Sequence, residues 1–240
     1  MGKQWKKAGK MEASAKKGAV TTKIAREIQV AAKMGGGDPN FNPRLRLALD
    51  LAKKNSVTND TIERSIKKGL GQLDDGKTID ETTYEGYGPH GVGVIVECQT
   101  DNKNRTAAEM RTIFKTHGGG MGETNSVSWM FERVCLIEAV KAGTFDPEEE
   151  AIEAGANEVV KNDSDEDQKE ITFSFYGSID QMENIRSQLQ GRGWKVTAAE
   201  LSFKAKNLTE LTEEQLKDVQ ECLQEFEDFD DSHRVYATLA

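Results

Sequence analysis

The chain has 240 residues, of which 36% are hydrophobic and 30% charged, and this length suits two or three domains. It contains no run of 18 apolar residues, so we expect no membrane-spanning helix. The basic first residues lack the apolar core of a secretory signal. Cys98, Cys135 and Cys222 lie far apart and form no CxxC pair, which favours a reducing compartment. We therefore expect a cytoplasmic protein.

The net charge of −9 conceals a strong asymmetry along the chain. Residues 1–72 carry sixteen Lys and Arg against six Asp and Glu, a net charge of +10, whereas residues 73–240 carry a net charge of −19. A basic segment joined to an acidic body is typical of proteins whose basic end binds a polyanion. The alternative is that these lysines only keep helices soluble. The charge distribution favours contact with nucleic acid.

The basic segment reads as a helical domain over residues 1–76. Apolar residues at helical spacing predict a helix over Thr21–Met34, and three glycines after it supply its end. Asn42 and Pro43 predict the start of a second helix. A third helix is expected to be capped within Thr58–Asp60, with Asp60 and Glu63 spaced as a capping box.

The candidate nucleic-acid-binding residues are the cations of this domain and one aromatic residue. Lysine and arginine neutralise phosphates without reading sequence, and an indole can stack on a base. The alternative for the first seventeen residues is a solvated tail. The set comprises Lys3, Trp5, Lys6, Lys7, Lys10, Lys16, Lys17, Lys23, Arg26, Arg44 and Arg46.

A second candidate contact lies at the end of the stretch from Thr83 to Thr106. Glycine and proline turn residues precede a β-branched run in this stretch, which predicts a turn that leads into a buried strand. A helix is expected to follow, and its first N–H groups, together with Asn102, Arg105 and Thr106, could hold a phosphate or RNA. The alternative is that Asp101 or Asn102 caps the helix while Arg105 pairs with a neighbouring acid.

Two glycine motifs match nucleotide-binding patterns only by letter. Residues 71–78 read GQLDDGKT, but a phosphate loop needs a strand before it and a helix after it, and here a basic helix precedes an extended segment. Residues 86–91 satisfy GxGxxG, but a strand follows where a dinucleotide site needs a helix. The histidines lack metal-ligand spacing. Asp163, Asp165 and Asp167 resemble the start of a calcium loop, but Gln168 replaces its glycine and Ser174 its closing carboxylate. We expect no cofactor, no metal and no enzyme activity, with a nucleotide hydrolase using residues 71–78 as the alternative.

The rest of the chain alternates strands and helices. Thr212 and Gln215 are spaced as a capping box and predict a final helix within Leu208–Phe226. This helix and a last strand could complete the module begun at Thr83, so the middle domain would comprise residues 80–133 and 207–240 and be interrupted by a domain over 134–206. A strand is expected at Ser126–Arg133 before the interruption. The interrupting segment is expected to hold strands at Cys135–Val140, Ile171–Tyr176 and Trp194–Phe203 and helices at Asp146–Lys161 and Ser178–Leu189.

Four stretches resemble the YebC family, whose eukaryotic relatives include the mitochondrial translational activator of cytochrome oxidase. They are GGGDPNFNPRLRLAL at 35–49, NDTIERSIKKG at 59–69, TYEGYGPHGVGVIVECQTDNKNRTAAEM at 83–110 and SVSWMFER at 126–133. The resemblance covers essentially the whole chain.

The resemblance implies an α+β fold of three domains: an N-terminal three-helix domain and two ferredoxin-like α/β domains, the third inserted in the second. It also implies a nonenzymatic DNA-binding transcriptional regulator. The alternative that it implies is a ribosome-associated translation factor that assists synthesis through proline-rich sequences. The expected partner is therefore DNA or ribosomal RNA, and possible association with the ribosome belongs to the second reading.

Overall fold

The computed structural model describes residues 4–73, 78–162 and 171–239, and the side chains of residues 4–17 lie outside this description. The fold is α+β, with three N-terminal helices and two antiparallel sheets. The chain divides into two compact units, residues 1–130 with 207–240 and residues 131–206. The second sheet therefore belongs to an insertion in the chain that builds the first, as predicted.

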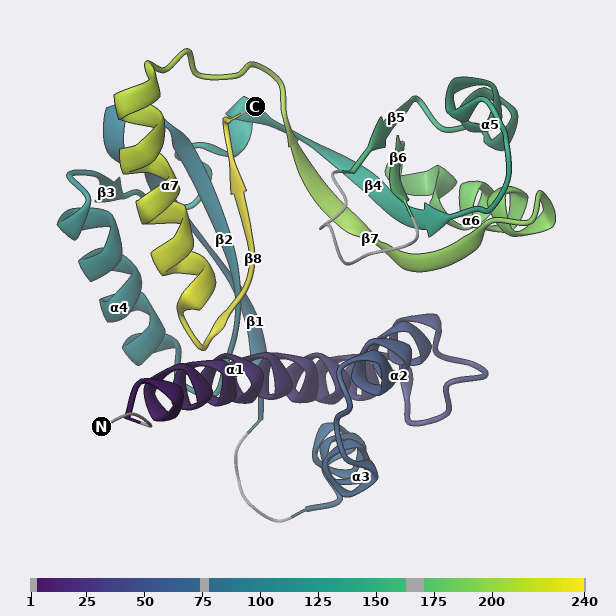
Figure 1. The fold of residues 1–240 in the computed structure, drawn as a ribbon, viewed down its shortest axis with the longest axis horizontal. Helices are drawn as coiled ribbons and strands as arrows, with labels where there is room; N and C mark the ends of the chain where they lie inside the picture. Colours follow the sequence, from purple (N-terminus) through teal and green to yellow (C-terminus); the bar gives the residue numbers. More distant parts are fainter. Residues whose placement is uncertain (1–3, 74–77, 163–170, 240) are drawn as a thin grey trace. The chain divides into compact units, whose positions relative to one another are not determined.

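Three helices form the N-terminal domain of the first unit: α1 (Gln4–Gly35), α2 (Pro43–Lys54) and α3 (Asn59–Gly69) (Figure 1). Asn42 caps α2 by accepting a hydrogen bond from the N–H of Leu45, and Thr58 caps α3 by accepting one from the N–H of Thr61. The prediction that Asp60 and Glu63 form a capping box is wrong. Helix α3 begins at Asn59 with Thr58 as its N-cap, so Asp60 already lies inside the helix. Small and branched side chains fill the core between the helices: Ile24, Ile28, Ala31, Leu45, Ala48, Ala52 and Val57.

The remainder of the first unit is a sheet in the order β3-β1-β2-β8, with α4 and α7 packed against it (Figure 1). Strand β2 is buried along nearly its whole length, which matches its run of β-branched residues. Phe114 of α4 and Phe226 of α7 meet over the sheet with their ring centroids 4.7 Å apart. The elements are β1 (Asp80–Tyr87), β2 (Gly93–Thr100), α4 (Lys103–Thr116), β3 (Gly120–Met121), α7 (Glu213–Asp228) and β8 (Ser232–Ala237).

The second unit has the ferredoxin-like βαββαβ order, with strands arranged β5-β6-β4-β7. Its core includes Trp194, whose ring packs edge-to-face against Phe145, Phe173 and Phe175. The elements are β4 (Phe131–Val140), α5 (Pro147–Ala154), β5 (Glu158–Lys161), β6 (Thr172–Gly177), α6 (Met182–Gly191) and β7 (Lys195–Ala205).

Two predictions of regular structure were wrong in extent. The helix expected over Asp146–Lys161 ends at Ala154, because Gly155 adopts a left-handed conformation with φ of 80° and strand β5 follows. The strand expected over Ser126–Arg133 is a short 3₁₀ helix at Ser128–Met130 followed by β4. The carboxylate of Glu85 causes this bend, because it accepts hydrogen bonds from the backbone N–H groups of Asn125, Val127 and Ser128.

Other boundaries differ by length alone. The first helix starts at Gln4 instead of Thr21, since alanine and lysine, which dominate the intervening segment, are good helix formers. The final capped helix agrees with the prediction: Thr212 and Gln215 form a capping box at its start.

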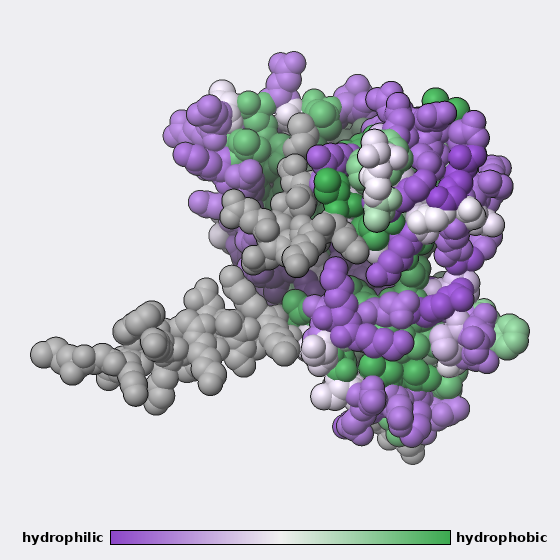
Figure 2. Space-filling model, turned by 45° about the vertical axis from the view of Figure 1, so that its right-hand side comes forward, coloured by the Kyte–Doolittle hydropathy of each residue, from purple (hydrophilic) through white to green (hydrophobic). Residues whose placement is uncertain are grey.

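Within the described residues, no helix is long and apolar enough to cross a membrane. On the face drawn in Figure 2, hydrophilic side chains cover most of the described surface and hydrophobic side chains show between them in small groups. Single exposed hydrophobic side chains are ordinary on protein surfaces, so only an unusually exposed one calls for a functional explanation.

Candidate nucleic-acid interface

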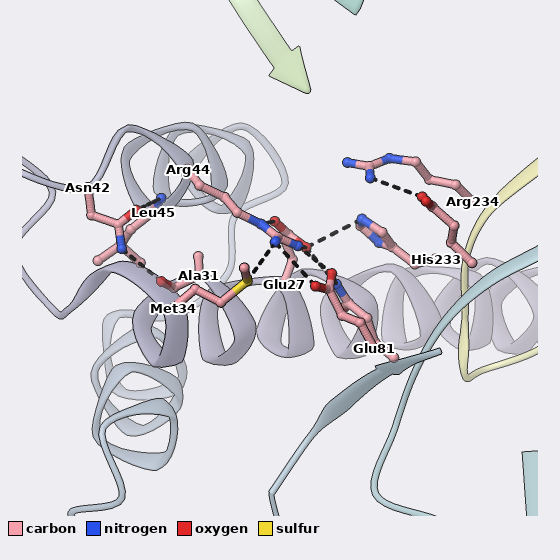
Figure 3. A network of polar contacts seen from close by, with 11 residues as sticks. Glu27, Ala31, Met34, Asn42, Arg44, Leu45, Glu81, His233 and Arg234 are labelled. Carbon is pink, nitrogen blue, oxygen red and sulfur yellow. Dashed lines mark hydrogen bonds and ion pairs between the residues drawn. The ribbon is translucent and has the colours of Figure 1, made fainter. Parts of the chain in front are cut away.

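Arg44, one of the predicted binding residues, lies inside an ion-pair network that joins the helical domain to the first sheet (Figure 3). Its Nε donates to Glu27 Oε1 of α1 at 2.7 Å, and its Nη2 donates to Glu27 Oε2 at 3.0 Å. The same Nη2 donates to Glu81 Oε1 of β1 at 2.7 Å. Planar guanidinium groups suit such two-carboxylate bridging. The hydrogen-bonding capacity of Arg44 is therefore largely used within the protein.

Glu27 is the buried centre of this network. Gln99 of β2 donates to Glu27 Oε2 at 2.7 Å, and His233 Nε2 of β8 lies 3.3 Å from the same oxygen. Burial alone would raise the pKa of Glu27, but the hydrogen bonds and charge of Arg44, with help from His233 and Gln99, hold that pKa below its usual value. Burial is the largest influence on the pKa of the His233 imidazole and lowers it to about 4. The nearby charge of Arg234 also lowers this pKa.

A second buried carboxylate, Asp231, takes up two more of the predicted cations. Arg26 of α1 contacts it at 3.0 Å and Arg105 of α4 also contacts it at 3.0 Å. Thr100 and Thr106 donate hydroxyl hydrogen bonds to the same side chain at 3.0 and 2.8 Å. Burial would raise the pKa of Asp231, but these hydrogen bonds and the charge of Arg26 lower it.

Lys23 is engaged in the same junction. Its ammonium group donates to the backbone carbonyl of Glu227, and Arg26 donates similarly to the carbonyl of Asp230. Burial lowers the pKa of Lys23, although Glu227 and neighbouring aspartates act in the opposite direction. Lys23 and Arg26 therefore anchor α1 against the segment that leads into β8.

The edge formed by Asn102, Arg105 and Thr106 is also internally bonded. Asn102 caps α4 by accepting from the N–H of Arg105 at 3.2 Å, and Arg105 pairs with Asp101 at 3.0 Å. The hydroxyl of Thr106 is fully buried against Thr100 and Asp231. These bonds match the alternative stated for this edge, in which Asn102 caps the helix and Arg105 pairs with a neighbouring acid. Contact with phosphate at this edge stays a prediction, and Arg105, half exposed at 49%, is its most accessible member.

Among the described side chains of the predicted N-terminal set, Lys23, Arg26 and Arg44 bind groups of the protein itself, whereas Arg46 is exposed. Lys3 lies outside the described residues. The other N-terminal members fall within the backbone of α1, with side chains outside the description: Trp5, Lys6, Lys7, Lys10, Lys16 and Lys17.

Arg46 of α2 is exposed, and among the residues that the structure describes it has no ion-pair partner. Four other cations of the helical domain are exposed but do not belong to the predicted set. They are Lys53, Lys54, Arg64 and Lys67. Of these, Lys53 pairs loosely with Asp50 at 3.6 Å, and both side chains are largely exposed. Exposure separates these available cations from the internally paired Lys23, Arg26 and Arg44.

The motif resembling a dinucleotide loop is a β-hairpin connection. Strand β1 ends at Tyr87, a 3₁₀ turn occupies Pro89–Gly91, and β2 follows antiparallel to β1. Gly86 has a packing reason to be glycine, because a Cβ there would lie 2.5 Å from the carbonyl oxygen of Gly120. The arrangement lacks the helix N-terminus that a dinucleotide pyrophosphate requires.

The other two lookalike motifs fall partly or wholly outside the described residues. Residues 74–77 of the phosphate-loop match lie outside them, although the described flanks are α3 before and β1 after. The acidic loop with Asp163, Asp165 and Asp167 also lies outside them. Across the described ranges, no group of three or more His, Cys, Asp or Glu side chains is arranged to hold a metal ion.

Comparison with known proteins places this architecture in a family. Residues 2–72 match the TACO1/YebC protein N-terminal domain, and residues 79–239 match the TACO1/YebC second and third domain. The chain belongs to the TACO1/YebC family. This membership confirms the resemblance seen in the four sequence stretches.

Relatives and a solved structure agree with the family membership over nearly the whole chain. The chain is 63% identical over 239 residues to the probable transcriptional regulatory protein Bd1964 of Bdellovibrio bacteriovorus, covering 100% of both chains. It is 44% identical over 228 residues to a probable transcriptional regulatory protein of Citrifermentans bemidjiense, covering 95% of this chain and 89% of that one. A crystal structure of a conserved hypothetical protein, Aq1575, from Aquifex aeolicus matches with a TM-score of 0.80 at 37% identity, covering 93% and 90% of the two chains.

Proposed function

We propose that this member of the TACO1/YebC family is a cytoplasmic, nonenzymatic regulator of gene expression that binds nucleic acid through its helical domain. The names of its relatives support a regulatory role. The observation that carries the binding proposal is the set of exposed cations on α2 and α3, within the segment 1–72 whose net charge is +10: Arg46, Lys53, Lys54, Arg64 and Lys67. All three cysteines are free and buried, which is consistent with a reducing compartment.

Binding through exposed lysine and arginine is electrostatic and needs no catalytic residue. Each cation that neutralises a phosphate releases counterions, so affinity falls as salt rises. Such contacts position a protein on a polyanion without reading its sequence. The N-terminal lysines of α1 belong to the same proposal, together with Trp5 as a stacking group. Arg105, beside Asn102 and Thr106, is proposed as a secondary phosphate contact.

The salt dependence of binding tests this proposal. The variant Arg46→Gln/Lys53→Gln/Lys54→Gln removes three exposed cations from the helical domain. Its plot of log affinity against log salt for duplex DNA should lose about 0.9 in slope for each phosphate contact removed. A matched control removes the same charge from three exposed lysines elsewhere, Lys115→Gln/Lys161→Gln/Lys195→Gln. Equal losses in the two variants would contradict a localised interface.

The target is either DNA or ribosomal RNA, and fractionation distinguishes the two. Cell extract is separated on a sucrose gradient with and without nuclease, and the protein is followed by immunoblot. A transcriptional regulator should leave dense fractions when DNA is digested. Co-migration with ribosomes that survives DNase but not RNase would contradict the transcriptional version and favour a ribosome-associated translation factor.

A further inference from the structure

The connection between α1 and α2 displays the most exposed large hydrophobic side chain that the structure describes. Phe41 is 84% exposed, and Met34 at the end of α1 is 69% exposed. A phenylalanine ring in water forgoes the favourable transfer that burial would give it. Phe41 also follows Asn40 and precedes the helix cap Asn42, so it lies in a polar segment where a hydrophobic core position is not expected.

The backbone around Phe41 is held firmly by its neighbours. The carboxylate of Asp38 accepts hydrogen bonds at 2.9 Å from both the backbone N–H and the side-chain amide of Asn40. The N–H of Phe41 donates to the carbonyl of Asp38 at 3.1 Å. The turn therefore fixes the direction in which the chain approaches Phe41.

Asn42 ties the other side of this turn to the helical domain. Its amide nitrogen donates to the carbonyls of Ala31 and Gly36, each at 2.8 Å, while its oxygen accepts from the N–H of Leu45 at 3.0 Å. The Asn42 side chain is buried, and a Cβ on Gly35 would lie 2.7 Å from it. Hydrogen bonds therefore hold the backbone on both sides of Phe41, which lowers the conformational entropy lost when the ring binds a partner.

The position of Phe41 relative to α2 explains why the ring is left outside. Phe41 immediately precedes the N-cap, and a hydrophobic residue there commonly packs against the fourth residue of the helix. That fourth residue is Arg46, which is exposed. The usual apolar partner is replaced by a cation, so the position combines an uncovered ring with an available guanidinium.

We propose that Phe41 stacks on an unpaired base of a single-stranded nucleic acid while Arg46 contacts its phosphate backbone. The inference rests on the proposed function and adds to it a preference for single-stranded segments. The positive charge of the surrounding domain favours a polyanionic partner over an acidic or neutral protein surface. Stacking on an exposed ring requires a base that is not paired within a duplex, because paired bases present only their edges.

Binding of labelled oligonucleotides to the full chain tests this inference. The probes are a 16-nucleotide single-stranded RNA of mixed sequence, a strand of the same length with abasic sites in place of its bases, and a duplex of the same length. Phe41→Ala should weaken binding to the base-bearing strand about tenfold. It should leave binding to the abasic strand and the duplex unchanged, while Phe41→Trp should retain the affinity of the original protein.

Two further variants separate stacking from charge and from general surface effects. Arg46→Gln should lower the salt-dependence slope for the single strand by about 0.7, whereas Phe41→Ala should leave that slope unchanged. Leu51→Ala removes another exposed hydrophobic side chain of α2, 47% exposed, and should behave as the original protein. Circular dichroism melting should give the same transition for Phe41→Ala and the original protein, since the ring is exposed.

The outcomes distinguish failure of the inference from failure of the proposed function. If the original protein binds all probes and Phe41→Ala binds them equally well, the stacking inference is wrong and the proposed function stands. The same conclusion follows if Phe41→Ala weakens the abasic strand or the duplex as much as the base-bearing strand. If the original protein binds no probe, both the inference and the proposed function are wrong.

Discussion

Substitution of Arg44 by glutamine should destabilise the junction between the helical domain and the first sheet by about 3 kcal/mol, because it removes one partner of a buried ion pair. Glu27, whose side chain is 12% exposed, would lose both bonds from Arg44 and keep Gln99 and the uncharged His233 as neighbours. Glu81 is 42% exposed and can be rehydrated, so most of the cost comes from Glu27 alone.

Arg46→Gln, two residues further along α2, is the matched control because Arg46 is exposed. Urea unfolding followed by circular dichroism compares both variants with the original protein, and hydrogen exchange of α1 and α2 shows where stability is lost. Arg44→Gln should lower the unfolding midpoint and increase exchange in both helices, while Arg46→Gln should change stability by less than about 0.5 kcal/mol. Equal stability of the two variants would refute the division into structural and available cations.

Three other predictions concern a buried histidine, a close approach between backbone segments and the phosphate-loop match at residues 71–78. The pKa of His233 in the folded protein, about 4, lies below its unfolded value of about 6.5. Between these two values the unfolded state binds more protons, so the free energy of unfolding should fall by about 2 kcal/mol from pH 7 to pH 5. Urea unfolding of His233→Gln should show a smaller fall, and an NMR titration that gives His233 a pKa near 6.5 would contradict this explanation. A Cβ on Gly119 would lie 2.1 Å from the carbonyl oxygen of Tyr87, whereas one on Gly120 meets open space; Gly119→Ala should therefore lower the melting temperature clearly more than Gly120→Ala. Calorimetry with magnesium-ATP should show no binding, and binding that Lys77→Ala abolishes would support the hydrolase alternative instead.

Local rules predicted the parts of the fold whose signals lie close together in sequence. Asn42 before Pro43 and Thr212 three residues before Gln215 predicted helix starts that the structure confirms. Their success has a simple cause, since a cap bonds N–H groups two or three residues away. The β-branched run of β2 was equally clear because the strand is buried along its length.

Predictions failed where a distant residue decides the local conformation. The alternation of Val127, Trp129 and Phe131 is typical of a strand, yet Glu85, about forty residues earlier, binds the backbone there and bends it. Strand β5 was missed for two reasons. Its pairing partner β6 comes only after the acidic loop, and the short sequence of β5 continued the preceding helical pattern. In both cases the deciding interaction is nonlocal, and short-range patterns carry little of its information.

The same limit applies to the candidate interface. The sequence-based prediction treated Arg26, Arg44 and Arg46 alike as nucleic-acid-binding residues. The order of residues in a sequence does not show which acids lie opposite each side chain in the folded protein. In the folded protein, Asp231 pairs with Arg26 and Glu27 pairs with Arg44. In each pair the acid lies in a different part of the chain from the arginine. Part of the positive charge therefore stabilises the attachment of the helical domain to the sheet, and only the remainder is available to a polyanion. Binding and stability should consequently respond to different arginines, so a variant that loses nucleic-acid affinity without losing stability identifies the interface.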